Sequence, residues 1–121
     1  MQYLFLIYAD EVLESEMTEA EMGALLQNYG KYSALLESRG VLRAGEGLQP
    51  STTATSIRVR NDDTLITDGP FAETKEQLGG FYLVDCASLD EALELAAQIP
   101  SANYGTVEVR PVMDYSQLAD D

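Results

Sequence analysis

The chain has no histidine and only one cysteine among its 121 residues. Without histidine it lacks the usual general base near neutral pH and the commonest protein ligand for metals. This excludes a Ser-His-Asp or Cys-His mechanism and argues strongly against a zinc site. A carboxylate-only magnesium or calcium site stays open, but EF-hand spacing, a phosphate-binding glycine loop and a dinucleotide fingerprint are all missing. We therefore expect neither a metal nor an organic cofactor.

Positive charge is also scarce, because 7 Lys and Arg residues stand against 21 Asp and Glu residues, for a formal net charge of −14. Nucleic-acid binders cluster basic side chains to neutralise phosphates. Here the basic residues are scattered along the chain, at Lys31, Arg39, Arg43, Arg58, Arg60, Lys75 and Arg110. Binding to nucleic acid or to an anionic membrane is not expected. A base that does enter a pocket would be a good candidate to hold an anionic or carbonyl ligand.

Long apolar runs are missing as well. No stretch approaches the ~20 apolar residues of a membrane span. The apolar residues 3–8 are few, and they lack the charged region and cleavage site of a signal peptide. Because Cys86 is alone, no intrachain disulfide can form, and we expect a cytoplasmic protein. Cys86 itself is expected to be a small buried side chain at a strand end.

The length and composition of the sequence suit one domain over residues 1–113, followed by an acidic tail over 114–121. Capping boxes predict the start of two helices, at Thr18-Glu19-Ala20-Glu21 and Ser88-Leu89-Asp90-Glu91. Gly40 and Pro100 mark their ends. The residues with helical spacing are Met22, Leu25, Leu26, Tyr29, Ser33 and Leu36 in the first helix, and Leu89, Ala92, Leu93 and Ala96 in the second. Residues 9–17 are expected to form an acidic loop.

Strands are predicted at residues 2–8, 41–47, 80–85 and 106–112, with a β-hairpin inserted at residues 52–67. Without the hairpin the order is βαββαβ, the ferredoxin-like α+β arrangement, with an antiparallel sheet and both helices on one face. Two helices can cover only one face of the sheet, yet residues 2–8 and 80–85 are apolar on both faces. A second copy of the sheet is the economical cover, so we expect a homodimer.

The densest group of ionisable residues lies between two glycine-containing turns, Gly69-Pro70 and Gly79-Gly80. Glycine and proline give such a segment a defined shape, and shaped loops with charged side chains are where sites tend to lie. A polar structural turn is the open alternative. Asp68 either caps that turn or serves as a carboxylate base, and one of Glu73 and Lys75 is expected to turn inward.

The segment Asp68-Gly69-Pro70-Phe71 resembles the signature of the YCII-related proteins, in the branch named for this DGPF motif. Three other stretches, Leu4 to Tyr8, Ala44 to Pro50 and Val107 to Pro111, fit the same resemblance. It covers about residues 2–113 and implies the dimeric α+β barrel form of the ferredoxin-like fold. It also implies an association with extracytoplasmic-function sigma factors, beside which such proteins are often encoded.

YCII-like proteins have been proposed to use a histidine–aspartate pair, with the histidine on the first helix. The position that matches this histidine is Tyr29, so the pair cannot be carried over to this chain. Tyr29 either presents its hydroxyl to a pocket or fills the core as an aromatic side chain, and its place on the apolar helical face favours the core. The candidate catalytic residues are Asp68, Glu73 and Tyr29.

Strand ends and their loops rim the pocket of a sheet fold. The candidate ligand-binding residues lie there, at Tyr8, Glu46, Lys75 and Tyr82. Two functions stay open. The first is a cofactor-independent small-molecule enzyme or binder that uses a carboxylate near the Asp-Gly-Pro-Phe loop. The second is a non-catalytic regulatory or interaction protein that works with a sigma factor. An internal cavity would favour the first, and a closed interior the second.

Overall fold

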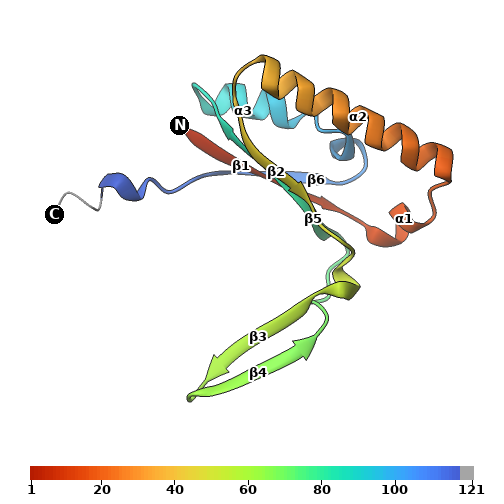
Figure 1. Cartoon of the computed structure of the whole chain (residues 1–121), viewed down its shortest axis with the longest axis vertical. Helices are drawn as coiled ribbons and strands as arrows, with labels where there is room; N and C mark the ends of the chain where they lie inside the picture. The colour runs from red at the N-terminus through yellow and green to blue at the C-terminus, as the bar shows by residue number, and fades with distance from the viewer. Residues whose placement is uncertain (118–121) are drawn as a thin grey trace.

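The computed structural model describes residues 1–117 and shows an antiparallel sheet with the two longer helices on one face (Figure 1). The strand order β2-β5-β1-β6 is that of the ferredoxin-like βαββαβ fold, as the sequence predicted. The sheet consists of β1 (Gln2–Ala9), β2 (Leu42–Gly47), β5 (Gln77–Asp85) and β6 (Thr106–Pro111). The helices that cover it are α2 (Glu19–Ser38) and α3 (Leu89–Ala96). None of the helices within residues 1–117 combines the length and apolar character that crossing a membrane requires.

Helix α2 begins and ends where its capping residues predict. The Glu21 N–H donates to Thr18 Oγ1 at 3.1 Å, and the Thr18 N–H donates back to the Glu21 carboxylate at 3.0 Å. This reciprocal pair is a capping box. Beyond the last turn, Gly40 has a φ of 70°, the left-handed conformation that commonly ends a helix. Helix α3 begins with half of this pattern, since Ser88 Oγ accepts the Glu91 N–H, whereas the Glu91 carboxylate accepts the Ala87 N–H.

A short helix, α1 (Glu11–Ser15), stands where the sequence predicted only an acidic loop. Asp10 caps it by accepting a hydrogen bond from the Val12 N–H at 2.9 Å. Five residues are too few for a hydrophobic period to be visible in the sequence, which is why the helix was missed.

The predicted apolar face of α3 was partly wrong. Leu89 and Leu93 are each 48% exposed, whereas Leu95 is fully buried together with Ala92. The buried stripe continues through Ala96 to Ile99 just past the helix. Both stripes have helical spacing, and the way the helix lies on the sheet decides which one is buried.

The core fills the layer between the helices and the sheet. Strand β1 contributes alternate residues Tyr3, Phe5 and Ile7, as the period of a strand requires. The largest fully buried side chains are Phe5, Leu36, Val84, Cys86, Leu95 and Ile99. Burying an apolar side chain of this size stabilises the fold by ~1.5–3 kcal/mol. The prediction that Cys86 is buried is confirmed.

Among residues 1–117, no helix lies on the opposite face of the sheet (Figure 1), and its two central strands present apolar side chains there. In the register of β1 and β5, Leu4 pairs with Leu83 and Leu6 with Phe81, and these side chains are half-buried. The two-sided apolar character predicted for the strands is therefore present.

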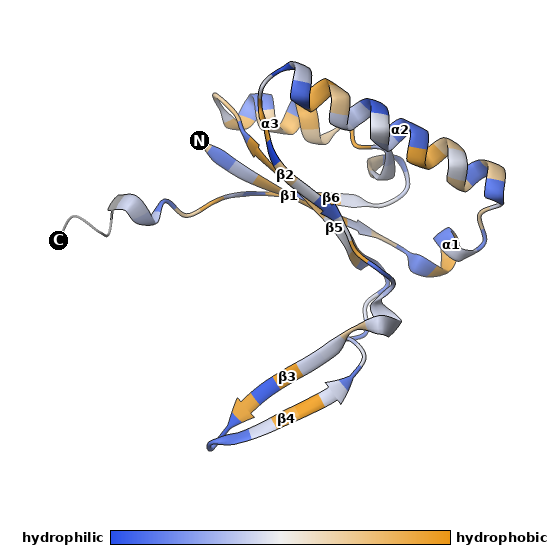
Figure 2. Ribbon diagram, viewed as in Figure 1, coloured by the Kyte–Doolittle hydropathy of each residue, from blue (hydrophilic) through white to orange (hydrophobic). Residues whose placement is uncertain are grey.

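The inserted hairpin consists of β3 (Thr55–Arg60) and β4 (Asp63–Asp68) and extends away from the main sheet (Figures 1 and 2). Its turn residues Asn61 and Asp62 both have positive φ, as in the tight turns that suit twisted strands. It carries exposed apolar side chains, including Ile57 and Ile66, which pair with each other across the strands. Residues 1–117 also contain three 3-10 turns, at Ser51–Thr53, Pro100–Asn103 and Tyr115–Gln117. The acidic tail predicted for residues 114–121 lies partly outside the described residues.

Candidate functional site

A cleft of about 850 Å³ lies between the first half of α2 and the neighbouring ends of β2 and β5. Its floor is made of glycines, because Gly47 pairs with Gly80 in the sheet and Gly45 pairs with Tyr82. A Cβ atom at Gly80 would lie 2.8 Å from the backbone oxygen of Glu46, so packing requires glycine there. A Cβ atom at Gly47 would meet no heavy atom within 4 Å. The space above Gly47 is thus open rather than filled by core side chains.

Helix α2 forms the opposite wall of the cleft. It presents one face at helical spacing, and the lining residues are Met22, Leu25, Leu26, Tyr29 and Ser33. The next turns of the same helix bury Tyr32 and Leu36 in the core. The apolar face predicted for this helix therefore divides into a part that seals the core and a part that lines a cleft.

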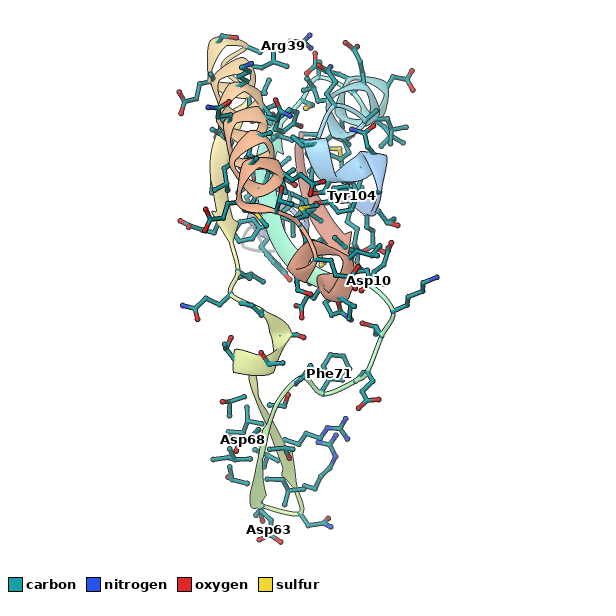
Figure 3. All side chains as sticks on the ribbon, turned by 90° about the vertical axis from the view of Figure 1, so that its right-hand side faces the viewer. Asp10, Arg39, Asp63, Asp68, Phe71 and Tyr104 are labelled. Carbon is teal, nitrogen blue, oxygen red and sulfur yellow. The ribbon has the colours of Figure 1, made fainter. Side chains whose placement is uncertain are left out.

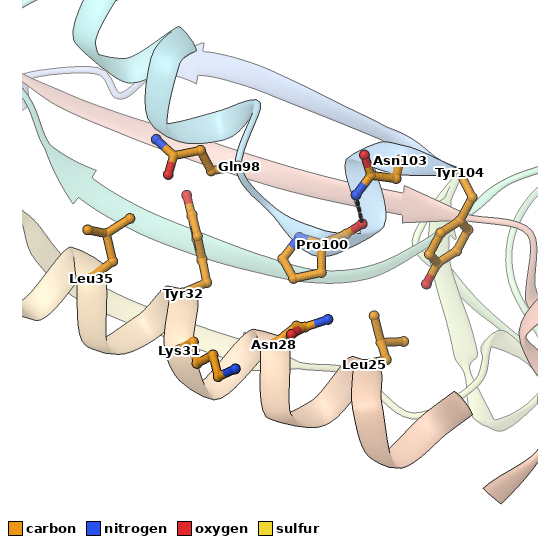
Figure 4. A pocket seen from close by; sticks show the side chains of 9 residues that line it. All are labelled: Leu25, Asn28, Lys31, Tyr32, Leu35, Gln98, Pro100, Asn103 and Tyr104. Atoms are coloured by element: carbon orange, nitrogen blue, oxygen red, sulfur yellow. Dashed lines mark hydrogen bonds between the residues drawn. The ribbon is translucent and has the colours of Figure 1, made fainter. Parts of the chain in front are cut away.

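A chain of hydrogen bonds runs from the cleft wall to a carboxylate. The hydroxyl oxygen of Tyr29 lies 2.6 Å from Ser101 Oγ, which lies 3.1 Å from the hydroxyl oxygen of Tyr104. The Tyr104 hydroxyl donates to Glu14 Oε2 at 3.0 Å. Tyr29, Ser101 and Glu14 line the cleft, whereas Tyr104 lines a neighbouring cavity of about 490 Å³ (Figure 4). We call these four residues the hydroxyl chain.

Ser101 occupies the centre of the hydroxyl chain and is only 3% exposed. It lies in the 3-10 turn that Pro100 begins, and its backbone oxygen accepts the Gly105 N–H at 2.7 Å. A Cβ atom at Gly105 would lie 2.2 Å from the Tyr8 backbone oxygen. Only glycine there lets this turn close against β1, and the closed turn holds Ser101 beneath Tyr29.

Burial raises the pKa of both tyrosines in the hydroxyl chain. The pKa of Tyr104 is raised to about 12, chiefly by desolvation. Desolvation also raises the pKa of Tyr29, although the hydrogen bond with Ser101 acts in the opposite direction. Both phenols therefore keep their protons at neutral pH.

A second hydroxyl pair lies deeper in the cleft. Ser33 Oγ and the Tyr82 hydroxyl oxygen are 2.9 Å apart. The ring of Tyr82 is held in place by an edge-to-face contact with Tyr32, with centroids 5.3 Å apart. Tyr32 is fixed in turn, because its hydroxyl donates to the Leu95 backbone oxygen at 2.8 Å.

The charge of the cleft is acidic. Glu11 and Glu14 line it, and its lining within the described residues includes no Lys or Arg. The Glu11 carboxylate is engaged by Ser51, whose backbone N–H and hydroxyl donate to it at 2.7 Å and 2.8 Å. These two bonds tie α1 to the turn after β2 at the cleft. A basic side chain, Lys31, lines the smaller cavity instead (Figure 4).

Of the seven site residues predicted from the sequence, Tyr29, Glu46 and Tyr82 border the cleft. Glu46 follows Gly45 on β2 and pairs with Phe81, so its side chain points to the opposite face of the sheet from Tyr82. Tyr8 pairs with Thr106 and lies on that opposite face as well. The structure thus brings together Tyr29 and Tyr82, and separates them from the side chains of Tyr8 and Glu46.

Asp68, Glu73 and Lys75 lie outside the cleft. Asp68 is the exposed last residue of β4, on the hairpin and far from Tyr104 (Figure 3). Glu73 and Lys75 are exposed in the loop that follows, and Phe71 beside them is 79% exposed. None of the three predicted residues lines either cavity. The Asp68 carboxylate also accepts no hydrogen bond from the residues that the structure describes, so it does not cap the turn there, and its site role stays a prediction.

Sequence reasoning missed Glu14, Ser101 and Tyr104. Glu14 lies in the helix that was expected to be a loop, and Ser101 and Tyr104 follow Pro100 in a segment without periodicity. A cluster of turn-forming residues from Pro100 to Gly105 was the only local signal.

The whole chain resembles known proteins. An uncharacterised protein of Rhizobium meliloti (strain 1021) is 42% identical over 117 residues, which are 95% of this chain and 94% of the relative. The solved structure of 5-chloro-2-hydroxyhydroquinone dehydrochlorinase from Burkholderia phenoliruptrix AC1100, in complex with 2,5-dihydroxybenzoquinone, gives a TM-score of 0.50 at 16% identity. That structure covers 97% of this chain and 98% of its own chain, and at this identity the likeness shows the fold alone. Residues 1–116 match the YCII-related domain, and the chain belongs to the YCII-related family.

Proposed function

We propose that this protein is a cofactor-independent enzyme or binder of small molecules that works in the cleft between α2 and the sheet. The observation that carries the proposal is the hydroxyl chain, which leads from the cleft wall at Tyr29 to the Glu14 carboxylate. Such a chain supplies what the missing histidine would supply, namely a group that takes a proton from a bound molecule and returns it.

The proton transfer can be written with all atoms accounted for. A ligand hydroxyl gives its proton to the Tyr29 oxygen while Tyr29 gives its own proton to Ser101, Ser101 to Tyr104, and Tyr104 to Glu14. The ligand oxygen keeps the electron pair of its broken O–H bond, and the negative charge moves from Glu14 to the ligand. The raised pKa values of Tyr29 and Tyr104 disfavour a free phenolate, so the transfers are expected to be concerted.

The carboxylate in this proposal is Glu14, whereas the sequence suggested a carboxylate near the Asp-Gly-Pro-Phe loop. Asp68 stays a prediction, because it lies on the hairpin and lines neither cavity. The structural likeness to a dehydrochlorinase supports the proposal only through the fold, since one fold can host many functions. The expected cytoplasmic location is likewise a prediction.

The alternative is a non-catalytic interaction protein that works with a sigma factor. The exposed apolar hairpin favours such a role, because exposed apolar surface often marks a binding face. The open cleft favours the small-molecule role, since an interaction protein has no need for a cavity of about 850 Å³ lined by hydroxyl groups.

Filling the cleft tests the proposal. Gly47→Leu places a side chain in the open space without a clash at its Cβ atom, and Gly23→Leu on the exposed surface of α2 is the matched control. A panel of small neutral compounds is screened by thermal denaturation with the wild type and both variants. A ligand present at 100 times its Kd raises the free energy of unfolding by ~2.7 kcal/mol. We expect the stabilising compounds to act on the wild type and Gly23→Leu but not on Gly47→Leu. Equal stabilisation of all three proteins would contradict the proposal.

A further inference from the structure

We infer that the cleft selects an uncharged ligand that donates a hydroxyl proton and also carries an oxygen acceptor, the pattern of a phenol or enol with a carbonyl-type group. This inference rests on the proposed function. It follows from the direction of the hydrogen bonds in the cleft, which the positions of the oxygen atoms and their protons determine.

Glu14 determines the direction of the hydrogen bonds in the hydroxyl chain. A carboxylate can only accept hydrogen bonds, so the single hydroxyl proton of Tyr104 points to Glu14. Tyr104 must then accept from Ser101, and Ser101, having used its own proton, must accept from Tyr29. Every proton of the hydroxyl chain is committed. The Tyr29 oxygen therefore faces the cleft as an acceptor that has no proton left to offer.

A ligand atom that contacts the Tyr29 oxygen must consequently be a donor. An anionic ligand oxygen has no proton, and it would face an unpaired lone pair there. It would also enter a cleft that Glu11 and Glu14 line and that no described basic side chain enters. Both effects disfavour anions, because buried acceptors without donors and uncompensated charges are costly.

The pair formed by Ser33 and Tyr82 offers the opposite group. Two hydroxyls carry two protons, and the bond between them at 2.9 Å uses one. The other proton is free to be donated to a ligand oxygen. Ser33 lies four residues after Tyr29 on α2, so the two polar positions are about one helical turn, or ~6 Å, apart along the helix axis. The acceptor and the donor thus lie about one aromatic ring apart.

The remainder of the cleft is apolar, with Met22, Leu25 and Leu26 on the helix side. An apolar body such as a ring suits this wall, and the volume of about 850 Å³ lies in the range of small-molecule sites, ~300–1,000 Å³. The ligand class is therefore a compact ring or enol with a hydroxyl at one end and an acceptor at the other.

Two probe molecules test whether the ligand must donate a hydroxyl proton. 4-Nitrophenol has a hydroxyl donor and a nitro acceptor, and 4-nitroanisole is its methyl ether without the donor. Calorimetric titration is performed at a pH where the phenol is neutral. We expect the phenol to bind at least tenfold more tightly than the ether. Tyr29→Phe should abolish this preference, while Tyr32→Phe should keep it, because the Tyr32 hydroxyl donates to Leu95 and does not line the cleft.

Two further measurements test the direction itself. Glu14→Gln can donate from its amide to Tyr104, so the hydroxyl chain can reverse, and the preference for phenol over ether should fall toward one. Raising the pH until 4-nitrophenol ionises should weaken its binding to the wild type, because the phenolate has no proton to donate.

The outcomes separate the inference from the proposed function. If Gly47→Leu blocks binding but the ether or the phenolate binds as well as the phenol, the cleft stands and the inference is wrong. If Gly47→Leu binds the phenol like the wild type, the cleft is not the site and both are wrong. If neither neutral probe binds at millimolar concentration, the inferred ligand class is wrong.

Discussion

Ser101→Ala is the substitution that tests the hydroxyl chain most sharply through stability. It removes one oxygen atom, which is nearly fully buried and bonded to Tyr29 at 2.6 Å and to Tyr104 at 3.1 Å. A hydrogen bond of this kind contributes about 1 kcal/mol, so the loss of two lowers the free energy of unfolding by about 2 kcal/mol. Tyr104 keeps its bond to Glu14, and Tyr29 borders the cleft where water can reach it, so no larger loss is expected. For a chain of this size the loss corresponds to a decrease in Tm of about 8 °C.

A double-mutant cycle shows whether the effect comes from the hydroxyl chain. Tyr104→Phe alone loses two hydrogen bonds, about 2 kcal/mol, but in the Ser101→Ala background it loses only the bond to Glu14, about 1 kcal/mol. The expected coupling is therefore about 1 kcal/mol, measured by urea denaturation followed by circular dichroism. Tyr32→Phe is the matched control, because its hydroxyl bonds to Leu95 and shares no partner with Ser101. The hydroxyl chain would be refuted by equal coupling of Ser101→Ala to Tyr104→Phe and to Tyr32→Phe, or by a coupling to Tyr104→Phe below about 0.3 kcal/mol.

Three other predictions concern the helix, the thiol and the assembly. Gly23→Ala and Gly30→Ala should each stabilise the protein by about 0.5–1 kcal/mol in urea denaturation, because both are exposed positions of α2 where a Cβ atom meets nothing within 4 Å. Destabilisation would contradict the helical conformation of these two positions. Burial raises the pKa of Cys86 to about 11, so the stability that the buried thiol contributes should be fully present below about pH 8.5 and be lost as the pH rises toward 11. Cys86→Ala should lose less stability at alkaline pH than the wild type, and identical losses would disprove this assignment. Sedimentation at micromolar concentration should show a homodimer that buries the apolar stripe of Leu6, Phe81 and Leu83 against a second copy. Phe81→Glu should dissociate this dimer, and a wild-type monomer would rule the dimer out.

Local signals predicted most of the fold. The capping box at Thr18 and Glu21 and the glycine after the helix act within a few residues, so α2 was visible in the sequence. Strand alternation predicted the sheet, and the turn at Asn61 and Asp62 predicted the hairpin. Where two stripes of α3 had helical spacing, the sequence could not decide which one the sheet would bury.

The site depended on contacts between distant segments. Tyr29 meets Ser101 across 72 residues, and Tyr104 meets Glu14 across 90. No periodicity or spacing in the sequence reports such a meeting, because the sheet order brings these segments together. The charged loop from Asp68 to Lys75 was conspicuous for its composition, but composition does not report burial, and the loop is exposed.

The central claim is that Tyr29, Tyr82 and the hydroxyl chain form a ligand site, and tyrosine NMR tests it directly. The protein has 7 tyrosines, so ¹³C labelling at the tyrosine Cζ atom gives one signal for each hydroxyl-bearing carbon. On titration with 4-nitrophenol, we predict that the signals of Tyr29, Tyr82 and Tyr104 shift together and saturably. The signals of Tyr3 and Tyr115, which lie outside the cleft lining, should stay in place. Saturable binding that leaves the Tyr29 and Tyr82 signals unmoved would contradict the account.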